Sequence, residues 1–443
     1  MAYQDKYQSY LEQVPQYIQY CQNANKRVVF GYTSDLDMIL KWDVNKFNKI
    51  LAEHLQESPY CEEGDVIDSL ESFAKIISYY AIRGAGGEID ITNWDVCEYL
   101  REEFYSEYAL GGTCAQGAAA FAAVGFPLIA HITDRSKPVC EFLDYPGLDM
   151  IKGDARMPMK ACATKELPVL HIIFQFEKGD IVKALGKEYV IPLSNRVIID
   201  YDTIHKKLPI DEEFLEYCEK HAEELVSYNV SGFNAILDFE LLEKKMECLR
   251  KHYLHVKTRN PNCCIYLEGA HYLSAKSKSL VFEKMSSCVD ILGMNEEEME
   301  DMAQREGIPV DKERLDSVLD VLERIINLYG CKGIVMHTKD YSMYIGEEMQ
   351  GVNVEMGLTL GNLMSCTRAR MGKYGTLEEC AQSLKEPLSP TGVRFAKELE
   401  SKSTTYMTCL VPSRYLEKPR YTIGLGDTFV AGMQVGLIRK DDC

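Results

Sequence analysis

The pattern of apolar and polar positions becomes more regular along the chain, and after residue 210 strand-like and helix-like segments alternate. Residues 1–27 are polar and rich in Gln and Tyr, which predicts an N-terminal helix, and the mainly apolar segment 27–31 predicts a buried strand. Further buried strands are predicted at 234–237, 264–267, 289–292 and 333–337. Strands separated by amphipathic helices predict an α/β fold with a mainly parallel central sheet.

The middle of the chain has a different pattern. Residues 41–80 have helical spacing, and residues 83–91 combine a glycine-rich turn with an alternating strand. Three β-type runs with short turns follow, at 170–176, 187–192 and 195–199. They predict a small antiparallel sheet apart from the main one, suited to a lid. The expected large domain comprises 1–42, 110–150 and 202–443, and the expected lid comprises 43–109 and 151–201.

Polar residues follow several of the predicted strands, where open α/β sheets bind ligands. Asp35 and Asp37 come just after the strand at 27–31, although a helix beginning at Leu36 with an Asp cap is an equal alternative. Glu268 ends the strand at 264–267, and Glu298 lies in an acidic segment after the strand at 289–292. Two carboxylates from neighbouring strand ends predict a Mg²⁺ site, whereas the helix dipole alone also favours acidic first turns.

A Gly-x-Gly-Asp turn at 424–427 precedes an apolar segment with helical spacing. Its glycines allow a tight turn that presents free N–H groups to an anion at a helix N-terminus. Asp427 is placed to accept the proton of a hydroxyl that attacks phosphorus, and the alternative is a glycine-rich turn with an Asp cap. A second turn, Gly111-Gly112, begins a run of small residues that predicts a tightly packed helix, and the turn itself is a candidate sugar contact.

Composition narrows the function classes. The chain has 443 residues, enough for two domains, and a net charge of -19 that argues against a nucleic-acid partner. Its 16 cysteines include no CxxC pair and are expected to be reduced thiols. The N-terminus lacks the features of a secretory signal, and the apolar run 118–130 is too short to span a bilayer. A cytoplasmic protein with no membrane partner is therefore expected.

Taken in order, these segments resemble the ADP-dependent glucokinase/phosphofructokinase family of the ribokinase-like superfamily. The Asn-x-x-Glu motif at 295–298, the Gly-x-Gly-Asp motif at 424–427 and the Gly-Gly pair at 111–112 carry the resemblance, which extends from about residue 27 to the C-terminus. The resemblance implies a ribokinase-like three-layer sandwich with a small β-rich lid. It also implies a kinase that uses ADP and Mg²⁺ to phosphorylate a hexose.

The resemblance assigns roles to individual residues. Asp427 would be the catalytic base and a metal ligand, and Gly424, Leu425 and Gly426 would form the anion hole. Glu268 and Glu298 would hold the metal, and the nucleotide would meet Asn295, His337, Thr338 and Val411. The sugar would meet Asp35, Asp37, Glu88, Gly111, Gly112 and Arg196. The sequence departs from the family pattern at Tyr266, where the family has His, and at Asp35, where it has Asn.

The sugar is the least determined part of this hypothesis. Glu88 resembles the carboxylate that glucose-specific members use, whereas Arg196, Lys160 and Lys165 are candidates for the phosphate of fructose 6-phosphate. An anionic pocket formed by the carboxylates favours glucose. Two alternatives remain: an ATP-dependent ribokinase-like kinase acting on another sugar or a nucleoside, and a non-catalytic sugar- or nucleotide-binding protein. The intact Asp427 and Glu298 argue against the second. Oligomeric state is not predicted.

Overall fold

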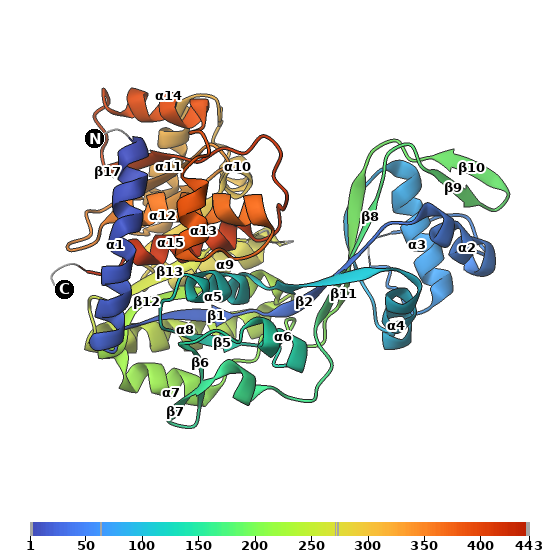
Figure 1. Ribbon diagram of the computed structural model, residues 1–443, viewed down its shortest axis with the longest axis horizontal. Coiled ribbons are helices and arrows are strands. Elements are labelled where there is room, and N and C mark those ends of the chain that lie inside the picture. Colours follow the sequence, from blue (N-terminus) through green and yellow to red (C-terminus); the bar gives the residue numbers. More distant parts are fainter. Residues whose placement is uncertain (1–2, 63, 271, 273, 440–443) are drawn as a thin grey trace.

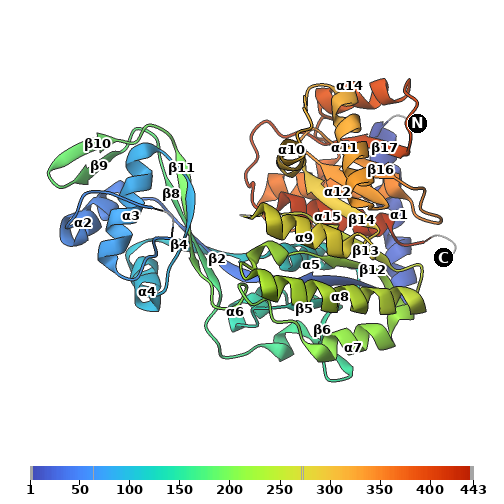
Figure 2. The same cartoon turned by 180° about the vertical axis from the view of Figure 1, so that it is seen from behind.

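The computed structural model describes residues 3–62, 64–270, 272 and 274–439. Two bodies of different size are joined by a narrow waist (Figures 1 and 2). Strands near residues 35–40, 106–111, 170–176 and 195–201 run from this waist into the smaller body. The chain therefore passes between the bodies several times, and residues far apart in the sequence meet at the waist.

The larger body contains a sheet that has ten strands within the described residues. In spatial order these are β17 (Met407–Pro412), β16 (Tyr341–Gly346), β15 (Gly333–His337), β14 (Ile291–Asn295), β13 (Cys264–Glu268), β12 (Leu225–Val230), β1 (Arg27–Tyr32), β5 (Leu128–Ile132), β6 (Leu148–Lys152) and β7 (Ala155–Pro158). The strands from β15 to β6 are parallel, and β16, β17 and β7 are antiparallel additions at the two sides. The predicted mainly parallel sheet is confirmed.

Helices cover both faces of this sheet, which makes three layers (Figures 1 and 2). One face is covered by α1 (Tyr3–Asn23), α5 (Thr113–Ala123), α12 (Val354–Met371), α13 (Leu377–Ser383) and α15 (Leu425–Gly436). The other is covered by α7 (Glu212–Lys220), α8 (Phe239–Arg259), α9 (Ala275–Met285), α10 (Glu296–Arg305), α11 (Leu315–Tyr329) and α14 (Pro390–Leu399). Central strands such as β13 are buried along their whole length because both of their faces are covered.

The smaller body contains a second sheet, with five strands in the described part of the chain. In spatial order they are β3 (Gly87–Asp90), β11 (Asn195–Tyr201), β8 (Leu170–Phe176), β2 (Asp35–Leu40) and β4 (Ser106–Gly111). Its helices are α2 (Val44–His54), α3 (Leu70–Arg83) and α4 (Trp94–Glu103). Phe174 from β8 contacts Phe47, Phe73 and Phe104 in the core beneath these helices. The opposite face of the sheet is left without a helical layer (Figure 1).

The remaining elements are short. They are the hairpin β9 (Ile181–Ala184) and β10 (Lys187–Val190), helix α6 (Lys137–Phe142), and the 3₁₀ turns η1 (Met159–Cys162), η2 (Ala222–Glu224) and η3 (Phe233–Ala235). The fifteen cysteines among the described residues are free thiols. Length and apolar character suited to crossing a bilayer are not combined in any described helix.

The structure corrects several details of the expected architecture. The strand predicted at 234–237 is wrong, since the chain forms a 3₁₀ turn there and the buried strand is β12, at Leu225–Val230. The alternative of a helix beginning at Leu36 is also wrong, because Asp35–Leu40 forms strand β2. The lid sheet is mixed rather than antiparallel, because β2 pairs parallel with β8, and β3 with β11.

Sheet membership also differs from the expected domain extents. Strand β2, expected in the large domain, pairs with β4 and β8 in the smaller sheet. Strands β6 and β7, which extend into the segment expected to be lid, belong to the larger sheet. Apolar runs identify strands but not their partners, because pairing depends on segments distant in sequence. We therefore propose that the lid comprises residues 35–111 and 170–201.

Candidate active site

The first turn of α15 presents a backbone surface for an anion. Gly424 precedes the helix in a left-handed conformation, with φ of 68°, and a Cβ at this position would collide with Gln116 Oε1. The first N–H groups of a helix have no partner within it, so those of Leu425, Gly426 and Asp427 remain available. The predicted glycine turn and helix start at this motif are confirmed. An anion placed here would meet the positive end of the helix dipole.

Asp427 lies at this helix start, close to the edge of the large sheet. A Cβ on the preceding Gly426 would be 3.0 Å from His337 Cε1, which places the turn directly against the end of β15. Burial and then the Glu268 carboxylate raise the pKa of Asp427 to about 8, while His337 and Arg368 act in the opposite direction. Asp427 therefore has a higher proton affinity than an ordinary aspartate, as suits a general base.

Three neighbouring strands end at this same edge. Glu268 ends β13, Asn295 ends β14 and His337 ends β15. Glu298 follows in the first turn of α10, where its Oε2 accepts the Asn295 N–H at 3.0 Å and Asn295 Oδ1 accepts the Glu298 N–H at 2.9 Å. This capping box fixes Glu298 at the sheet edge. The prediction that Glu268 and Glu298 lie at a shared edge is confirmed.

The carboxylates of Glu268 and Glu298 fit a hard divalent cation. Glu268 Oε2 is buried without a hydrogen-bond partner. Burial and then the charge of Glu268 raise the pKa of Glu298, as expected for two neighbouring carboxylates. Buried, repelling oxygen donors are stabilised by a Mg²⁺ ion, which prefers oxygen ligands. Tyr266, two residues before Glu268 in β13, is fully buried, and its pKa is raised by burial and by that carboxylate.

The candidate sugar residues Asp35 and Asp37 lie at the waist, on β2. Asp35 pairs with Gly111 of β4, where a Cβ would collide with Asp35 Oδ1. Gly112 then begins α5 with φ of 83°. The sequence-predicted Asp35, Asp37, Gly111 and Gly112 are thus brought together, because antiparallel pairing of β2 with β4 places them side by side.

Two further residues complete this cluster, and sequence reasoning missed both. His171 Nδ1 is 3.2 Å from Asp35 Oδ1, and His171 Nε2 is 3.8 Å from Asp200 Oδ1. Burial alone would lower the pKa of His171, but Asp35, Asp200 and Asp37 raise it to about 9. Burial raises the pKa of Asp200 to about 8, with the His171 charge opposing this and Glu88 adding to it. The three carboxyl groups around His171 therefore favour its charged form.

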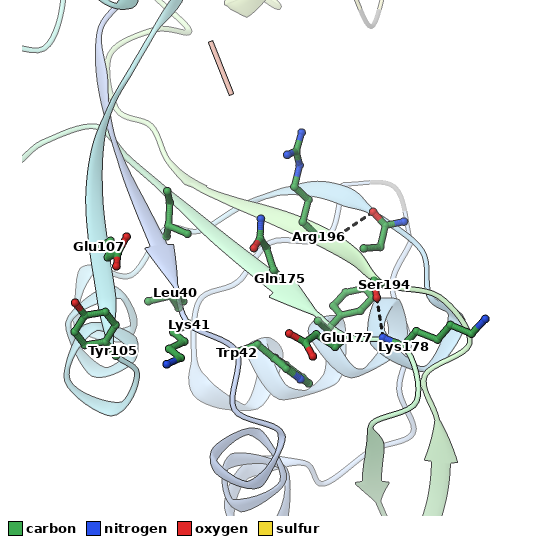
Figure 3. Close-up of a pocket in the computed structure, with 13 residues that line it drawn as sticks. Leu40, Lys41, Trp42, Tyr105, Glu107, Gln175, Glu177, Lys178, Ser194 and Arg196 are labelled. Atoms are coloured by element: carbon green, nitrogen blue, oxygen red, sulfur yellow. Dashed lines mark hydrogen bonds between the residues drawn. The ribbon is translucent and has the colours of Figure 1, made fainter. Parts of the chain in front are cut away.

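The other predicted sugar residues lie further out on the lid sheet. Glu88 is exposed on β3, opposite Ile198 of β11, and lies close enough to Asp200 to affect its pKa. Arg196 is exposed beside Gln175, at the margin of a hollow of about 910 Å³ over the distal part of the sheet (Figure 3). This hollow does not include Asp35, Asp37 or Asp427. Lys160 instead pairs with Asp144 at 3.0 Å on the larger body.

The predicted nucleotide residues divide into two groups. Asn295 and His337 lie at the sheet edge beside the candidate metal ligands. Thr338 Oγ1 donates to the Tyr341 carbonyl and accepts the Tyr341 N–H, both at 3.0 Å, so its hydroxyl holds the β15–β16 turn. Val411 is buried in β17, where its carbonyl accepts a hydrogen bond from Asn362 Nδ2 at 3.2 Å. The Thr338 hydroxyl and the Val411 carbonyl thus make hydrogen bonds within the protein.

The sequence contained an indication of three further site residues, namely a polar or charged residue in an otherwise apolar segment. A search for motifs does not find such residues, which are His171, Asp200 and Arg368. His171 and Asp200 are polar residues inside apolar strands, and Arg368 is a charged residue on a helix that is otherwise almost wholly buried. Buried charge is costly, so a charged residue in an apolar segment indicates a partner or a ligand. The identity of that partner depends on strands and helices far away in the sequence.

A glycine-capped helix start with free N–H groups, a carboxylate beside it and a carboxylate pair at the sheet edge are typical of phosphotransferases built on a three-layer α/β sandwich. The family model for the ADP-specific phosphofructokinase/glucokinase conserved region matches residues 26–436. The chain belongs to this family.

Relatives of both activities are similar along most of their length. The ADP-dependent glucose/glucosamine kinase of Pyrococcus abyssi is 24% identical over 435 residues, covering 91% of this chain and 92% of the relative. The ADP-specific phosphofructokinase of the same organism is 23% identical over 438 residues, covering 91% and 95%. These two identities differ too little to indicate which sugar this chain phosphorylates.

Solved structures show the same fold. The last common ancestor of ADP-dependent phosphofructokinases from Methanosarcinales has a TM-score of 0.82 with 18% identity, and the match covers 99% of each chain. An ADP-dependent kinase in complex with fructose-6-phosphate and ADPβS has a TM-score of 0.76 with 18% identity, also over 99% of each chain. The fold is therefore that of the ADP-dependent phosphofructokinases, a ribokinase-like sandwich with a lid.

Proposed function

We propose that this chain is an ADP-dependent hexose kinase that transfers the β-phosphate of ADP to a sugar hydroxyl, with Asp427 as the base. The observation that carries the proposal is the position of Asp427 in the anion-binding first turn of α15, beside the sheet edge formed by Glu268 and His337. Membership of the ADP-specific family supports ADP as the donor.

In the proposed reaction, the sugar hydroxyl oxygen attacks the β-phosphorus and a new O–P bond forms. The bond between the β-phosphorus and the bridging oxygen breaks, and its electron pair leaves with AMP. The hydroxyl proton passes to the carboxylate of Asp427. The N–H groups of Leu425, Gly426 and Asp427 stabilise the phosphoryl oxygens. Glu268 and Glu298 would hold Mg²⁺, which supplies charge neutralisation at the nucleotide phosphates.

For the acceptor, we propose glucose in preference to fructose 6-phosphate. The pocket at the waist is rich in carboxyl groups, since Asp35, Asp37 and Asp200 lie around His171. Carboxylates and an imidazolium suit the hydroxyl groups of a neutral sugar, whereas a phosphate would meet repulsion. Arg196, Lys160 and Lys165 are the residues that support the other acceptor. Arg196 lies on the exposed lid surface, and Lys160 pairs with Asp144.

A panel of sugars assayed with ADP or ATP and Mg²⁺ tests this function. We expect AMP and glucose 6-phosphate from ADP and glucose, and little product when ATP replaces ADP. Transfer from ATP in preference to ADP would refute the donor assignment. Binding of sugar and nucleotide without turnover, across the whole panel, would make the chain a binding protein.

A further inference from the structure

Arg368 is a buried cation that the reaction described above does not use. It lies on α12 with 4% of its surface exposed, and its Nε has no hydrogen-bond partner. Within the described residues its guanidinium forms no ion pair. The guanidinium carbon instead lies 4.1 Å from the centre of the Tyr374 ring and 4.5 Å from that of Tyr421. The two rings hold the guanidinium in place without neutralising its charge.

Hydrogen bonds tie this arrangement to the helix that binds the anion. Tyr374 Oη donates to Gln116 Oε1 at 3.3 Å, and this same oxygen lies against Gly424. The Tyr421 N–H donates to the carbonyl of Ala369, the residue after Arg368, at 3.2 Å. Arg368 is thereby held beside the Gly-x-Gly-Asp turn by contacts on both sides.

The positive charge of Arg368 affects the pKa of a carboxylate at the start of α15 and of another in the sugar pocket. It lowers the pKa of Asp427 at the helix start and that of Asp37 in the sugar pocket, in each case against the larger opposite effect of burial. Tyr421 Oη is also buried without a hydrogen-bond partner. An unpaired buried guanidinium is costly, so its retention where its charge acts on both parts of the site indicates an anion supplied by a ligand.

We propose that Arg368 binds the phosphoryl group during its transfer, together with the N–H groups at the start of α15. This inference rests on the proposed kinase function, because the phosphoryl group must pass between Asp427 and the sugar. A guanidinium offers a planar set of donors that matches phosphoryl oxygens. Held between two tyrosine rings, Arg368 needs no rearrangement as negative charge develops on those oxygens.

The test compares Arg368→Gln with Arg370→Gln in the full chain. Arg370 lies on the same helix, but its Nε and Nη2 donate to Ser383 Oγ and the Glu379 carbonyl, at 3.1 and 3.0 Å. With ADP, Mg²⁺ and glucose, Arg368→Gln is expected to lower kcat about 10²-fold or more with little change in the KM for glucose. Arg370→Gln is expected to keep a near-normal kcat.

A binding measurement provides a readout that does not depend on turnover. Calorimetry with inorganic phosphate is expected to show binding to the wild type and to Arg370→Gln, and binding about tenfold weaker or more in Arg368→Gln. Near-normal kcat and phosphate binding in Arg368→Gln, with a lowered Tm, would make Arg368 a structural cation and overturn the proposal. A rise confined to the KM for fructose 6-phosphate would also overturn it, by assigning Arg368 to the sugar's own phosphate.

Arg368→Lys keeps the test decisive if the glutamine variant does not fold. Lysine keeps the positive charge but lacks the planar set of guanidinium N–H donors. A kcat between those of the wild type and Arg368→Gln is therefore expected, and an unchanged kcat would overturn the proposal. Failure of the kinase function has a different signature: the wild type would phosphorylate no sugar, yet phosphate binding would still depend on Arg368.

Discussion

His337 Nε2 and Glu268 Oε1 lie 2.9 Å apart and join the carboxyl ends of β15 and β13 across the strand between them. This contact is possible because β14 has Gly293 opposite Glu268, where a Cβ would collide with Glu268 Oε2. Burial alone would lower the pKa of His337, but Glu268 raises it. A candidate metal ligand and a candidate nucleotide residue are thus coupled, and a cation bound by Glu268 would compete with the charge on His337.

Asp427→Asn is expected to lower kcat by about 10²-fold or more while leaving sugar and nucleotide binding in place. The amide has nearly the same shape but cannot accept the hydroxyl proton. Steady-state kinetics and calorimetry with each ligand measure the two effects. Asp320→Asn, on the exposed surface of α11, is the control for a general loss of charge. A near-normal kcat in Asp427→Asn would show that Asp427 is not the general base and serves only the start of α15.

Glu298→Gln is expected to raise the Mg²⁺ concentration for half-maximal rate by about tenfold. Glutamine keeps an oxygen that can accept the Asn295 N–H, so the cap survives while the negative charge is lost. The measurement is a Mg²⁺ titration at saturating nucleotide. Glu297→Gln is the matched control, because Glu297 is exposed in the same helical turn. Equal Mg²⁺ dependence in both variants would show that Glu298 serves the helix alone.

Glu88→Ala is expected to reduce kcat/KM for glucose much more than for fructose 6-phosphate. A hydrogen bond to a charged acceptor contributes roughly 1.5–3 kcal/mol, and fructose 6-phosphate is not expected to depend on it. Arg196→Ala provides the converse comparison, since a phosphate-binding arginine would selectively raise the KM for the phosphorylated sugar. Equal losses on both sugars in Glu88→Ala, with the selective effect in Arg196→Ala, would favour fructose 6-phosphate as the substrate.

Asp35→Asn is expected to lower the pKa of His171 from about 9 by about one unit or more, because it removes the carboxylate that raises this pKa most. In the wild type, His171 should keep its charge at neutral pH and lose it as pH rises through about 9. An NMR titration of the histidine ring, assigned with His171→Gln, measures both values. The same pKa in wild type and Asp35→Asn would show that Asp35 does not act on His171.

The sequence by itself determined the elements whose signals are local. The glycine turn before α15, the Asn295 cap of α10 and the polar residues after buried strands were all recognisable, because each depends on a few adjacent residues. The order of motifs along the chain also indicated the family. Parallel strands place their carboxyl ends at one edge, so the meeting of Glu268 with Glu298 followed from sequence pattern alone.

The tertiary structure alone decided which charges face one another. His171 lies next to Asp35 and Asp200 because β8 is placed between β2 and β11, and no local pattern specifies that strand order. Arg368 reaches the site because its helix packs against α15 and because tyrosines from two other segments hold its side chain. Local propensity determines whether a segment is a helix or a strand, whereas the site's electrostatics arise from pairings between distant segments that only the folded chain fixes.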